Sequence, residues 1–130
     1  MPARILYVDD EDDIREIAQM SLEIEPQFEV RSSSSGAAAL ADAAAWRPDL
    51  ILLDVMMPDM DGPETLKRLG QSPLTASIPV VFITARTQTH EVERYRAMGA
   101  VGVIAKPFDP LALAGEVKKL LASSAGGPAA

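Results

Sequence analysis

Apolar runs of strand length alternate with longer segments of helical periodicity along most of this 130-residue chain. Four continuous runs rich in β-branched residues are typical of parallel strands covered on both faces, and they occupy residues 5–8, 50–53, 80–83 and 101–104. A fifth run at residues 28–31 is more polar, which favours a strand at the edge of the sheet. The order predicts an α/β fold, a doubly wound five-stranded parallel sheet flanked by five helices.

Segments of helical periodicity separate these runs. The apolar positions of the first predicted helix share one face, which is formed by Ile14, Ile17, Ala18 and Leu22. Those of the last predicted helix are Leu113, Val117, Leu120 and Leu121. Residues 36–46 are rich in alanine, which favours a helix packed closely on the sheet. The helix predicted at residues 88–98 has a thin apolar stripe, so we expect it to be mobile.

Length and composition predict one domain over residues 1–122, long enough to bury a hydrophobic core. The chain contains no cysteine, so this core forms without disulfides. Residues 123–130 are small and include two glycines and a proline, so we expect a disordered tail there and no output domain. The apolar runs are too short to span a membrane and the first residues do not resemble a signal peptide, so we expect a soluble, cytoplasmic protein. A net charge of −7 argues against direct binding to nucleic acid.

Charged and hydroxyl side chains follow the predicted strands. They are Asp9 and Asp10 after the first strand, Asp54 after the third, Thr84 after the fourth and Lys106 after the fifth. Because ligands bind at the carboxyl ends of the strands in an open α/β sheet, we expect these residues to meet in one pocket. Three carboxylates held together repel one another unless a cation intervenes, which indicates a hard divalent ion such as Mg²⁺.

Each of these residues has an ordinary explanation when it is considered alone, such as a turn, a helix cap or an exposed loop. Their conjunction at four strand ends favours a phosphoryl-transfer site. A carboxylate held in line with a phosphohistidine or an acyl phosphate can attack the phosphorus, while a cation and Lys106 offset the charge. The carboxylates of Glu11, Asp12 and Asp13 are instead interpreted as helix-starting residues, which the helix dipole favours.

Four segments around these residues resemble the signature of response-regulator receiver domains. They are Val8-Asp9-Asp10-Glu11, the stretch from Leu53-Asp54 to Asp61-Gly62, Ile83-Thr84-Ala85, and Lys106-Pro107-Phe108, in the order and at the spacing of that family. The resemblance covers residues 3 to about 122 and is similar throughout to the single-domain chemotaxis type. It implies the flavodoxin-like receiver fold and a two-component signalling protein.

The resemblance also implies a role for each residue of the pocket. Asp54 would be the phosphoacceptor, with Thr84 and Lys106 contacting the phosphoryl group. Mg²⁺ would be bound by Asp10, Asp54 and the backbone carbonyl of Met56, and by Asp9 through a water molecule. The bond between Lys106 and Pro107 is usually cis in such domains.

A receiver domain is a phosphoacceptor that promotes its own phosphorylation and dephosphorylation, and it is not an enzyme with a separate substrate. Its donor would be a histidine kinase or a histidine phosphotransfer protein, and it would signal by contact with an unidentified downstream protein. The resemblance allows a homodimer through the face built from the last two helices and the fifth strand, and it implies contact with neither nucleic acid nor a membrane.

Two features depart from the common pattern of the family. An aromatic residue is common on the fifth strand where this chain has Val103, so coupling between threonine movement and an aromatic rotamer is not expected here. Met56 and Arg86 stand where polar or acidic residues orient the attacking water in the family. Neither supplies such a group, so we expect slow self-dephosphorylation.

The residues bear on three alternative functions. A haloacid-dehalogenase-type phosphatase needs a second aspartate two residues after the nucleophile, where this chain has Met56. A mononucleotide-binding module needs glycines in the first loop, where this chain is acidic. A receiver-like protein-binding module that acts without phosphorylation stays open.

Overall fold

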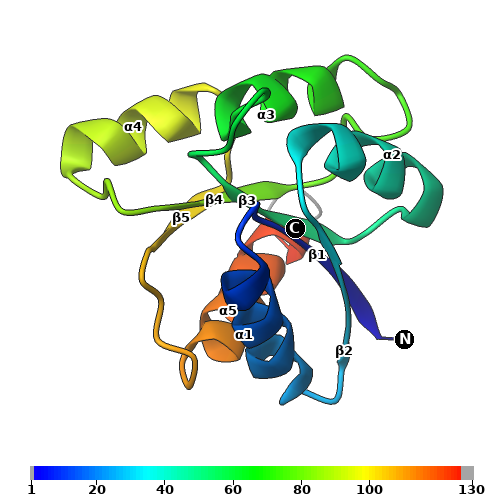
Figure 1. Cartoon of the computed structure of the whole chain (residues 1–130), viewed down its shortest axis with the longest axis vertical. Helices are drawn as coiled ribbons and strands as arrows, with labels where there is room; N and C mark the ends of the chain where they lie inside the picture. The colour runs from blue at the N-terminus through cyan, green and yellow to red at the C-terminus, as the bar shows by residue number, and fades with distance from the viewer. Residues whose placement is uncertain (1, 127–130) are drawn as a thin grey trace.

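Helices cover both faces of a five-stranded sheet in the computed structural model, which describes residues 2–126 (Figure 1). The strands are β1 (Ala3–Val8), β2 (Phe28–Ser33), β3 (Leu50–Asp54), β4 (Val80–Thr84) and β5 (Gly102–Ala105). The helices are α1 (Asp12–Glu23), α2 (Gly36–Trp46), α3 (Gly62–Gly70), α4 (Thr89–Ala97) and α5 (Leu113–Gly126). The predicted order of strands and helices is therefore confirmed.

The sheet has the strand order β2-β1-β3-β4-β5, and every pair is parallel. The chain runs outward from β1 to β2 and then crosses back to β3, so the direction of winding reverses between β1 and β3. Val8 pairs with Leu53 in the register of these two strands. The residues that follow them therefore emerge side by side at one end of the sheet, where open α/β folds bind ligands.

Alternate residues of each strand pack on opposite faces of the sheet. In β4, Val81 and Ile83 join the cluster formed with α1 and α5, whereas Phe82 joins the cluster formed with α2, α3 and α4. Figure 1 shows the same division, with α1 and α5 on one side of the sheet and the other three helices opposite. Both faces of the central strands are thus buried, which is why their sequences are continuously apolar.

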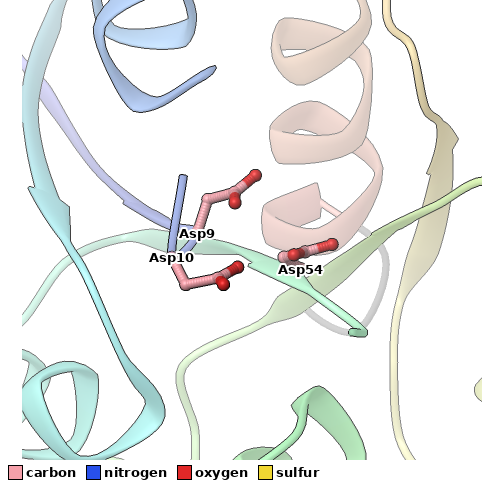
Figure 2. Close-up of side chains that lie close together, drawn as sticks. All are labelled: Asp9, Asp10 and Asp54. Carbon is pink, nitrogen blue, oxygen red and sulfur yellow. The ribbon is translucent and has the colours of Figure 1, made fainter. Parts of the chain in front are cut away.

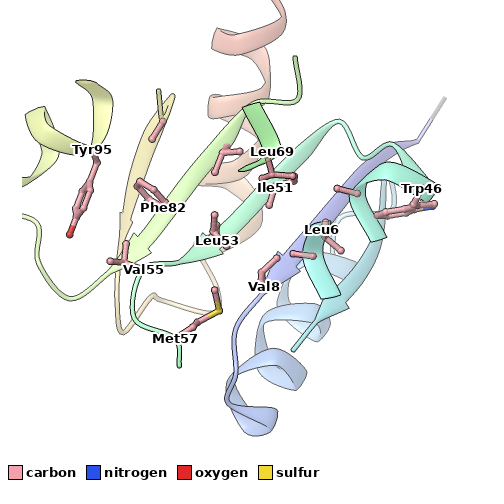
Figure 3. Packing of buried hydrophobic residues seen from close by; sticks show 14 residues of the cluster. Leu6, Val8, Trp46, Ile51, Leu53, Val55, Met57, Leu69, Phe82 and Tyr95 are labelled. Atoms are coloured by element: carbon pink, nitrogen blue, oxygen red, sulfur yellow. The ribbon is translucent and has the colours of Figure 1, made fainter. Parts of the chain in front are cut away.

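Helix α4 is the most lightly packed of the helices on its face. Within the described chain, Tyr95 is the one residue of α4 that is buried. Its ring meets that of Phe82 edge to face, with 5.1 Å between the ring centroids (Figure 3). The thin apolar stripe predicted for this helix is confirmed, since the helix is fixed to the sheet by a single aromatic side chain.

The loop between β3 and α3 is drawn tightly against the sheet. Asp61 caps α3 by accepting a hydrogen bond from the backbone N–H of Glu64 at 2.9 Å. The N–H of Gly62 donates to the carbonyl of Val55 at 2.9 Å. A Cβ at Gly62 would lie 2.7 Å from the carbonyl oxygen of Asp54. A glycine is therefore required for this close approach.

The structure differs from the sequence-based expectations in three details. The sequence predicts Ile17 on the inward face of α1, but it is 43% exposed, whereas Ala18 and Leu22 are buried in the core and Ile14 packs against it. β2 continues to Ser33 and β5 begins at Gly102, each a shift at a strand end. Helix α5 continues through Gly126, four residues into the predicted tail, since alanine and serine do not stop a helix. Residues 127–130 of that tail lie outside the described part of the chain.

Candidate functional site

Three carboxylates converge where β1 and β3 end. Asp9, Asp10 and Asp54 each place an oxygen within 4.8 Å of the others (Figure 2). Asp9 and Asp54 are buried, whereas Asp10 is exposed. The pairing of β1 with β3 brings these residues together although 44 positions separate Asp10 from Asp54 in the chain. The predicted cluster of strand-end carboxylates is therefore present.

Asp9 is held by three hydrogen bonds. Its Oδ2 accepts from the hydroxyl of Tyr7 at 3.2 Å and from Nζ of Lys106 at 3.0 Å. Its Oδ1 accepts from the backbone N–H of Glu11 at 3.0 Å. Both oxygens of this fully buried carboxylate are thus engaged, which fixes its orientation in the pocket.

Tyr7 is a site residue that the sequence analysis did not identify. Burial, followed by the charge of Asp9, raises the pKa of Tyr7 far above its ordinary value, so the phenol stays neutral and remains a donor. A signal for it exists in the sequence, because residues two apart in a strand point to the same face. Tyr7 and Asp9 are spaced in this way.

Lys106 reaches the carboxylates from the end of β5. Its Nζ lies 3.0 Å from Asp9, 3.4 Å from Glu11 and 3.5 Å from Asp54. The peptide bond between Lys106 and Pro107 is cis, and the backbone N–H of Lys106 donates to the carbonyl of Thr84 at 2.9 Å. Burial alone would favour the neutral amine, but the hydrogen bond to Asp9 and the neighbouring negative charges raise the pKa of Lys106. The side chain is therefore a cation in this pocket.

Glu11 has a contact that the sequence analysis did not predict. We interpreted it as a helix-starting residue, and it does occupy the N-cap position of α1, although its side chain makes no capping hydrogen bond. Its carboxylate instead lies beside Lys106. Asp12 and Asp13 stand in the first turn of α1, as expected.

The surroundings of Asp54 raise the pKa of its carboxyl group. Burial and then the charge of Asp9 raise the pKa of Asp54 to about 6, and Lys106 opposes this shift. The carboxylate is still largely ionised at neutral pH, but its charge is poorly compensated by the protein. Three carboxylates near one ammonium leave a net negative site, which is the condition that favours a bound cation.

Thr84 is the last residue of β4, the strand next to β3. It is buried, and its Oγ1 accepts a hydrogen bond from the backbone N–H of Arg86 at 3.0 Å. That bond uses an oxygen lone pair, so the hydroxyl can still donate its proton to an acceptor. Met56, in the loop after β3, is 72% exposed, and the side chain of Arg86 is exposed as well.

The donor set fits a hard divalent cation. Carboxylate oxygens are the ligands that Mg²⁺ prefers, and Asp10 is exposed, with a carboxylate that accepts no hydrogen bond from the described residues. Asp54 contributes a second carboxylate, while the oxygens of Asp9 are already engaged by hydrogen-bond donors. The arrangement can hold a cation and can present the carboxylate of Asp54 to an electrophile.

Comparison with known proteins identifies the family. Residues 5–118 match the family model described as the response regulator receiver domain. The chain belongs to this family. The predicted resemblance and the predicted receiver fold are both confirmed. The residues that the structure brings together, Asp9, Asp10, Asp54 and Lys106, are among those on which the resemblance is based.

Curated relatives of this receiver domain are longer proteins. It is 37% identical over 124 residues to the alkaline phosphatase synthesis transcriptional regulatory protein PhoP of Bacillus subtilis, covering 95% of this chain and 50% of that protein. It is 41% identical over 120 residues to the response regulator PleD of Caulobacter vibrioides, covering 92% of this chain and 26% of that protein. The chain thus spans half or less of these relatives.

Solved structures of similar length share the fold. The chemotaxis response regulator CheY4 of Vibrio cholerae is 32% identical with a TM-score of 0.84, and the match covers 92% of this chain and 99% of that one. A response regulator from Desulfuromonas acetoxidans is 29% identical with a TM-score of 0.80, and the match covers 92% and 96%. Over residues 2–126, none of the helices combines the length and the apolar character needed to cross a membrane.

Proposed function

We propose that this receiver domain accepts a phosphoryl group on Asp54 from a phosphohistidine donor, in a reaction that depends on Mg²⁺, and signals in the cytoplasm by contact with other proteins. The observation that carries the proposal is the convergence of Asp9, Asp10 and Asp54 within 4.8 Å beside the ammonium of Lys106. Such a site combines an ionised nucleophile with the means to offset the charge of an incoming phosphoryl group.

The transfer is a displacement at phosphorus. An oxygen of Asp54 forms a bond to phosphorus while the bond from phosphorus to the imidazole nitrogen of the donor breaks. That nitrogen keeps the electron pair, and the product on this chain is an aspartyl-phosphate. A pKa of about 6 leaves Asp54 mostly ionised at neutral pH, so no separate base is needed to activate it.

Lys106 and Thr84 would contact the phosphoryl oxygens. The ammonium of Lys106 lies 3.5 Å from the carboxylate of Asp54 and would move from Asp9 towards the new negative charge. The hydroxyl of Thr84, which now accepts from the N–H of Arg86, would donate its proton to a phosphoryl oxygen. The end of β4 and the loop after it therefore respond to phosphorylation.

Asp10 and Asp54 are the proposed direct ligands of the metal, with the backbone carbonyl of Met56. Asp9 would act through a water molecule, since Tyr7, Glu11 and Lys106 already donate to three of the about four acceptor positions on its two oxygens. Bound Mg²⁺ would supply the positive charge that the pocket lacks while the phosphoryl group is transferred. We further propose that the same residues support the slow hydrolysis of the aspartyl-phosphate.

Helix α1 offers a surface for the donor protein. Ile17, Met20 and Ile24 are exposed, and their spacing places them on one side of the helix. The helix begins at Asp12, directly after the acidic pocket, so a protein seated on this stripe would bring its phosphohistidine near Asp54. Ile17→Ser combined with Met20→Ser should slow transfer from a phosphohistidine protein and leave labelling by acetyl phosphate unchanged.

A homodimer through α4, β5 and α5 stays a prediction.

The direct test is uptake of phosphate from acetyl phosphate, followed by intact mass spectrometry. Wild-type protein should gain one phosphoryl group when Mg²⁺ is present and none when the metal is chelated. Asp54→Asn should gain none, while the control Asp13→Asn should behave as wild type because Asp13 stands outside the carboxylate cluster. Wild-type protein that gains no phosphoryl group in Mg²⁺ would favour the alternative of a receiver-like binding module.

A further inference from the structure

Helix α4 packs on the sheet through a single buried side chain among the described residues, that of Tyr95. Tyr95 is 2% exposed, whereas the other described residues of Thr89–Ala97 are exposed or half-buried. At the start of the helix, Gln88 stands at the N-cap and makes no side-chain capping hydrogen bond. Residues 85–90 are exposed throughout. The segment between Thr84 and Tyr95 is thus free to shift as long as the tyrosine ring follows.

The ring of Tyr95 is seated on Phe82, two residues before Thr84 in β4 (Figure 3). The rings meet edge to face at an interplanar angle of 69°. Residues two apart in a strand lie on the same face of the sheet, so Phe82 and Thr84 belong to one face. A movement of Thr84 therefore displaces β4, the strand that carries Phe82, on which Tyr95 packs.

Phe82 also lies close to Gly62, the first residue of α3. Its Cε1 lies 3.2 Å from the position that a Cβ would take on Gly62, and that same position lies 2.7 Å from the carbonyl oxygen of Asp54. The Phe82 ring is thus held between the start of α3 and the ring of Tyr95. It has little room to absorb a displacement without passing it to Tyr95.

The neighbouring strand, β5, offers no aromatic partner to Phe82. Val103 of β5 pairs with Phe82 in the register and is only partly buried against the same cluster. Valine supplies no ring, so the aromatic contact on Phe82 comes from α4 itself. Because the aromatic side chain belongs to α4, a shift of β4 can be transmitted to the helix directly, without a rotamer change on β5.

We infer that Tyr95, through its contact with Phe82, is the positioning residue that couples phosphorylation at Asp54 to the placement of α4. When the hydroxyl of Thr84 turns to the phosphoryl group, the end of β4 shifts, the seat on Phe82 changes, and Tyr95 carries α4 to a new position. The loop 85–88 responds to the phosphoryl group in any case, whereas the response of α4 depends on the ring of Tyr95. This inference rests on the proposed function.

The test compares hydrogen–deuterium exchange with and without beryllium fluoride and Mg²⁺, a mixture that places a phosphoryl-like group on an aspartate. In the wild type, exchange should change by about threefold or more both in residues 84–88 and in residues 89–98. Tyr95→Leu, which keeps apolar volume but no ring, should retain the change in the loop and lose most of the change in α4. Its rate of labelling by acetyl phosphate should stay within about twofold of the wild type, since Tyr95 does not touch the pocket.

Two matched variants separate coupling from general loosening of the core. Tyr95→Phe keeps the ring and should respond as the wild type. Leu66→Ala removes apolar volume from the same cluster on α3 and should leave the response of α4 intact. A response of α4 of wild-type size in Tyr95→Leu, or its loss in Leu66→Ala as well, would overturn the inference. Absence of any change in residues 84–88 of the wild type would overturn the proposed function and the inference with it.

Discussion

Nζ of Lys106 lies 3.0 Å from Oδ2 of Asp9, closer than its 3.5 Å approach to Asp54. The lysine is thus hydrogen-bonded to a carboxylate other than that of the proposed phosphoacceptor, Asp54. In this position it offsets part of the negative charge of the pocket, and it is near enough to Asp54 to change partners when the charge there increases. Removing the lysine should therefore have opposite effects on metal binding and on phosphorylation.

Lys106→Gln should bind Mg²⁺ more tightly than the wild type, because the pocket loses its positive charge and its carboxylates repel one another more strongly. The same variant should accept phosphate about tenfold more slowly, since one group that stabilises the transferring phosphoryl is gone. Calorimetric titration with Mg²⁺ and the rate of labelling by acetyl phosphate measure the two effects. A loss of metal affinity in this variant would show that Lys106 supports the metal site.

Asp10→Asn should weaken the binding of Mg²⁺ by about tenfold or more, because it removes an anionic ligand. A tenfold loss of affinity corresponds to about 1.4 kcal/mol of binding free energy. Asp13→Asn serves as the control, since Asp13 lies in the first turn of α1 and outside the carboxylate cluster. Titration of both variants under the same conditions gives the comparison. Equal losses would mean that the boundary between the pocket and the start of α1 is misplaced.

The raised pKa of Asp54 predicts a pH dependence of stability in metal-free protein. The folded state holds the proton up to a pH of about 6 and the unfolded state up to its ordinary value of 3.8, so folding favours the protonated form. Relative to Asp54→Asn, the wild type should lose stability as the pH rises from 4 to 6 and then level off. The loss should be on the order of 2 kcal/mol, and Mg²⁺ should reverse it at pH 7.

Urea denaturation in the presence of a chelator measures this difference at each pH. The variant Asp54→Asn removes the titrating group, so the subtraction isolates the contribution of Asp54. A wild type that gains stability over the variant between pH 4 and pH 6 would have the opposite sign. That result would mean that the pocket favours the ionised carboxylate even without metal.

Hydrolysis of the aspartyl-phosphate should be slow in the wild type and faster in a double variant. Met56 is an exposed apolar side chain after β3, and Arg86 follows Thr84 with its side chain exposed. Met56→Asn with Arg86→Glu supplies groups that bind and orient water and removes a cation that can cover the phosphoryl group. Decay of the phosphorylated protein after removal of the donor, at constant Mg²⁺, gives the rates. An unchanged or slower decay would show that these positions do not control access of water.

Much of the fold could be predicted because buried parallel strands have continuous apolar sequences. The strand-end rule then predicted that Asp9, Asp10 and Asp54 lie together, which the structure shows, without any knowledge of distances. The exposure of Ile17 could not be predicted in this way, since helical periodicity gives the direction of a face but not how much of it a neighbour covers. The width of the buried face depends on how α5 and β2 meet α1.

The contacts of Tyr7, Glu11 and Tyr95 were missed for a related reason. Tyr7 reads as one more apolar position of a buried strand, and its hydroxyl gains meaning only beside Asp9. The pairing of Glu11 with Lys106 joins residues 95 positions apart. The buried ring of Tyr95 packs on Phe82, 13 positions earlier in the chain. The contacts of Glu11 and Tyr95 are tertiary and no local pattern reports them, whereas the two-residue spacing of Tyr7 and Asp9 is a local signal.

The most direct test of the account is to locate the phosphoryl group on the chain. Protein treated with acetyl phosphate is reduced with borohydride, which converts an aspartyl-phosphate into homoserine, and the modified residue is then identified by peptide mass spectrometry. We predict homoserine at position 54 when Mg²⁺ is present and unmodified Asp54 when the metal is chelated. Phosphate on another residue, such as His90 or Asp10, or modification at position 54 that is equally strong in the chelator, would contradict the assignment of Asp54 as the Mg²⁺-dependent phosphoacceptor.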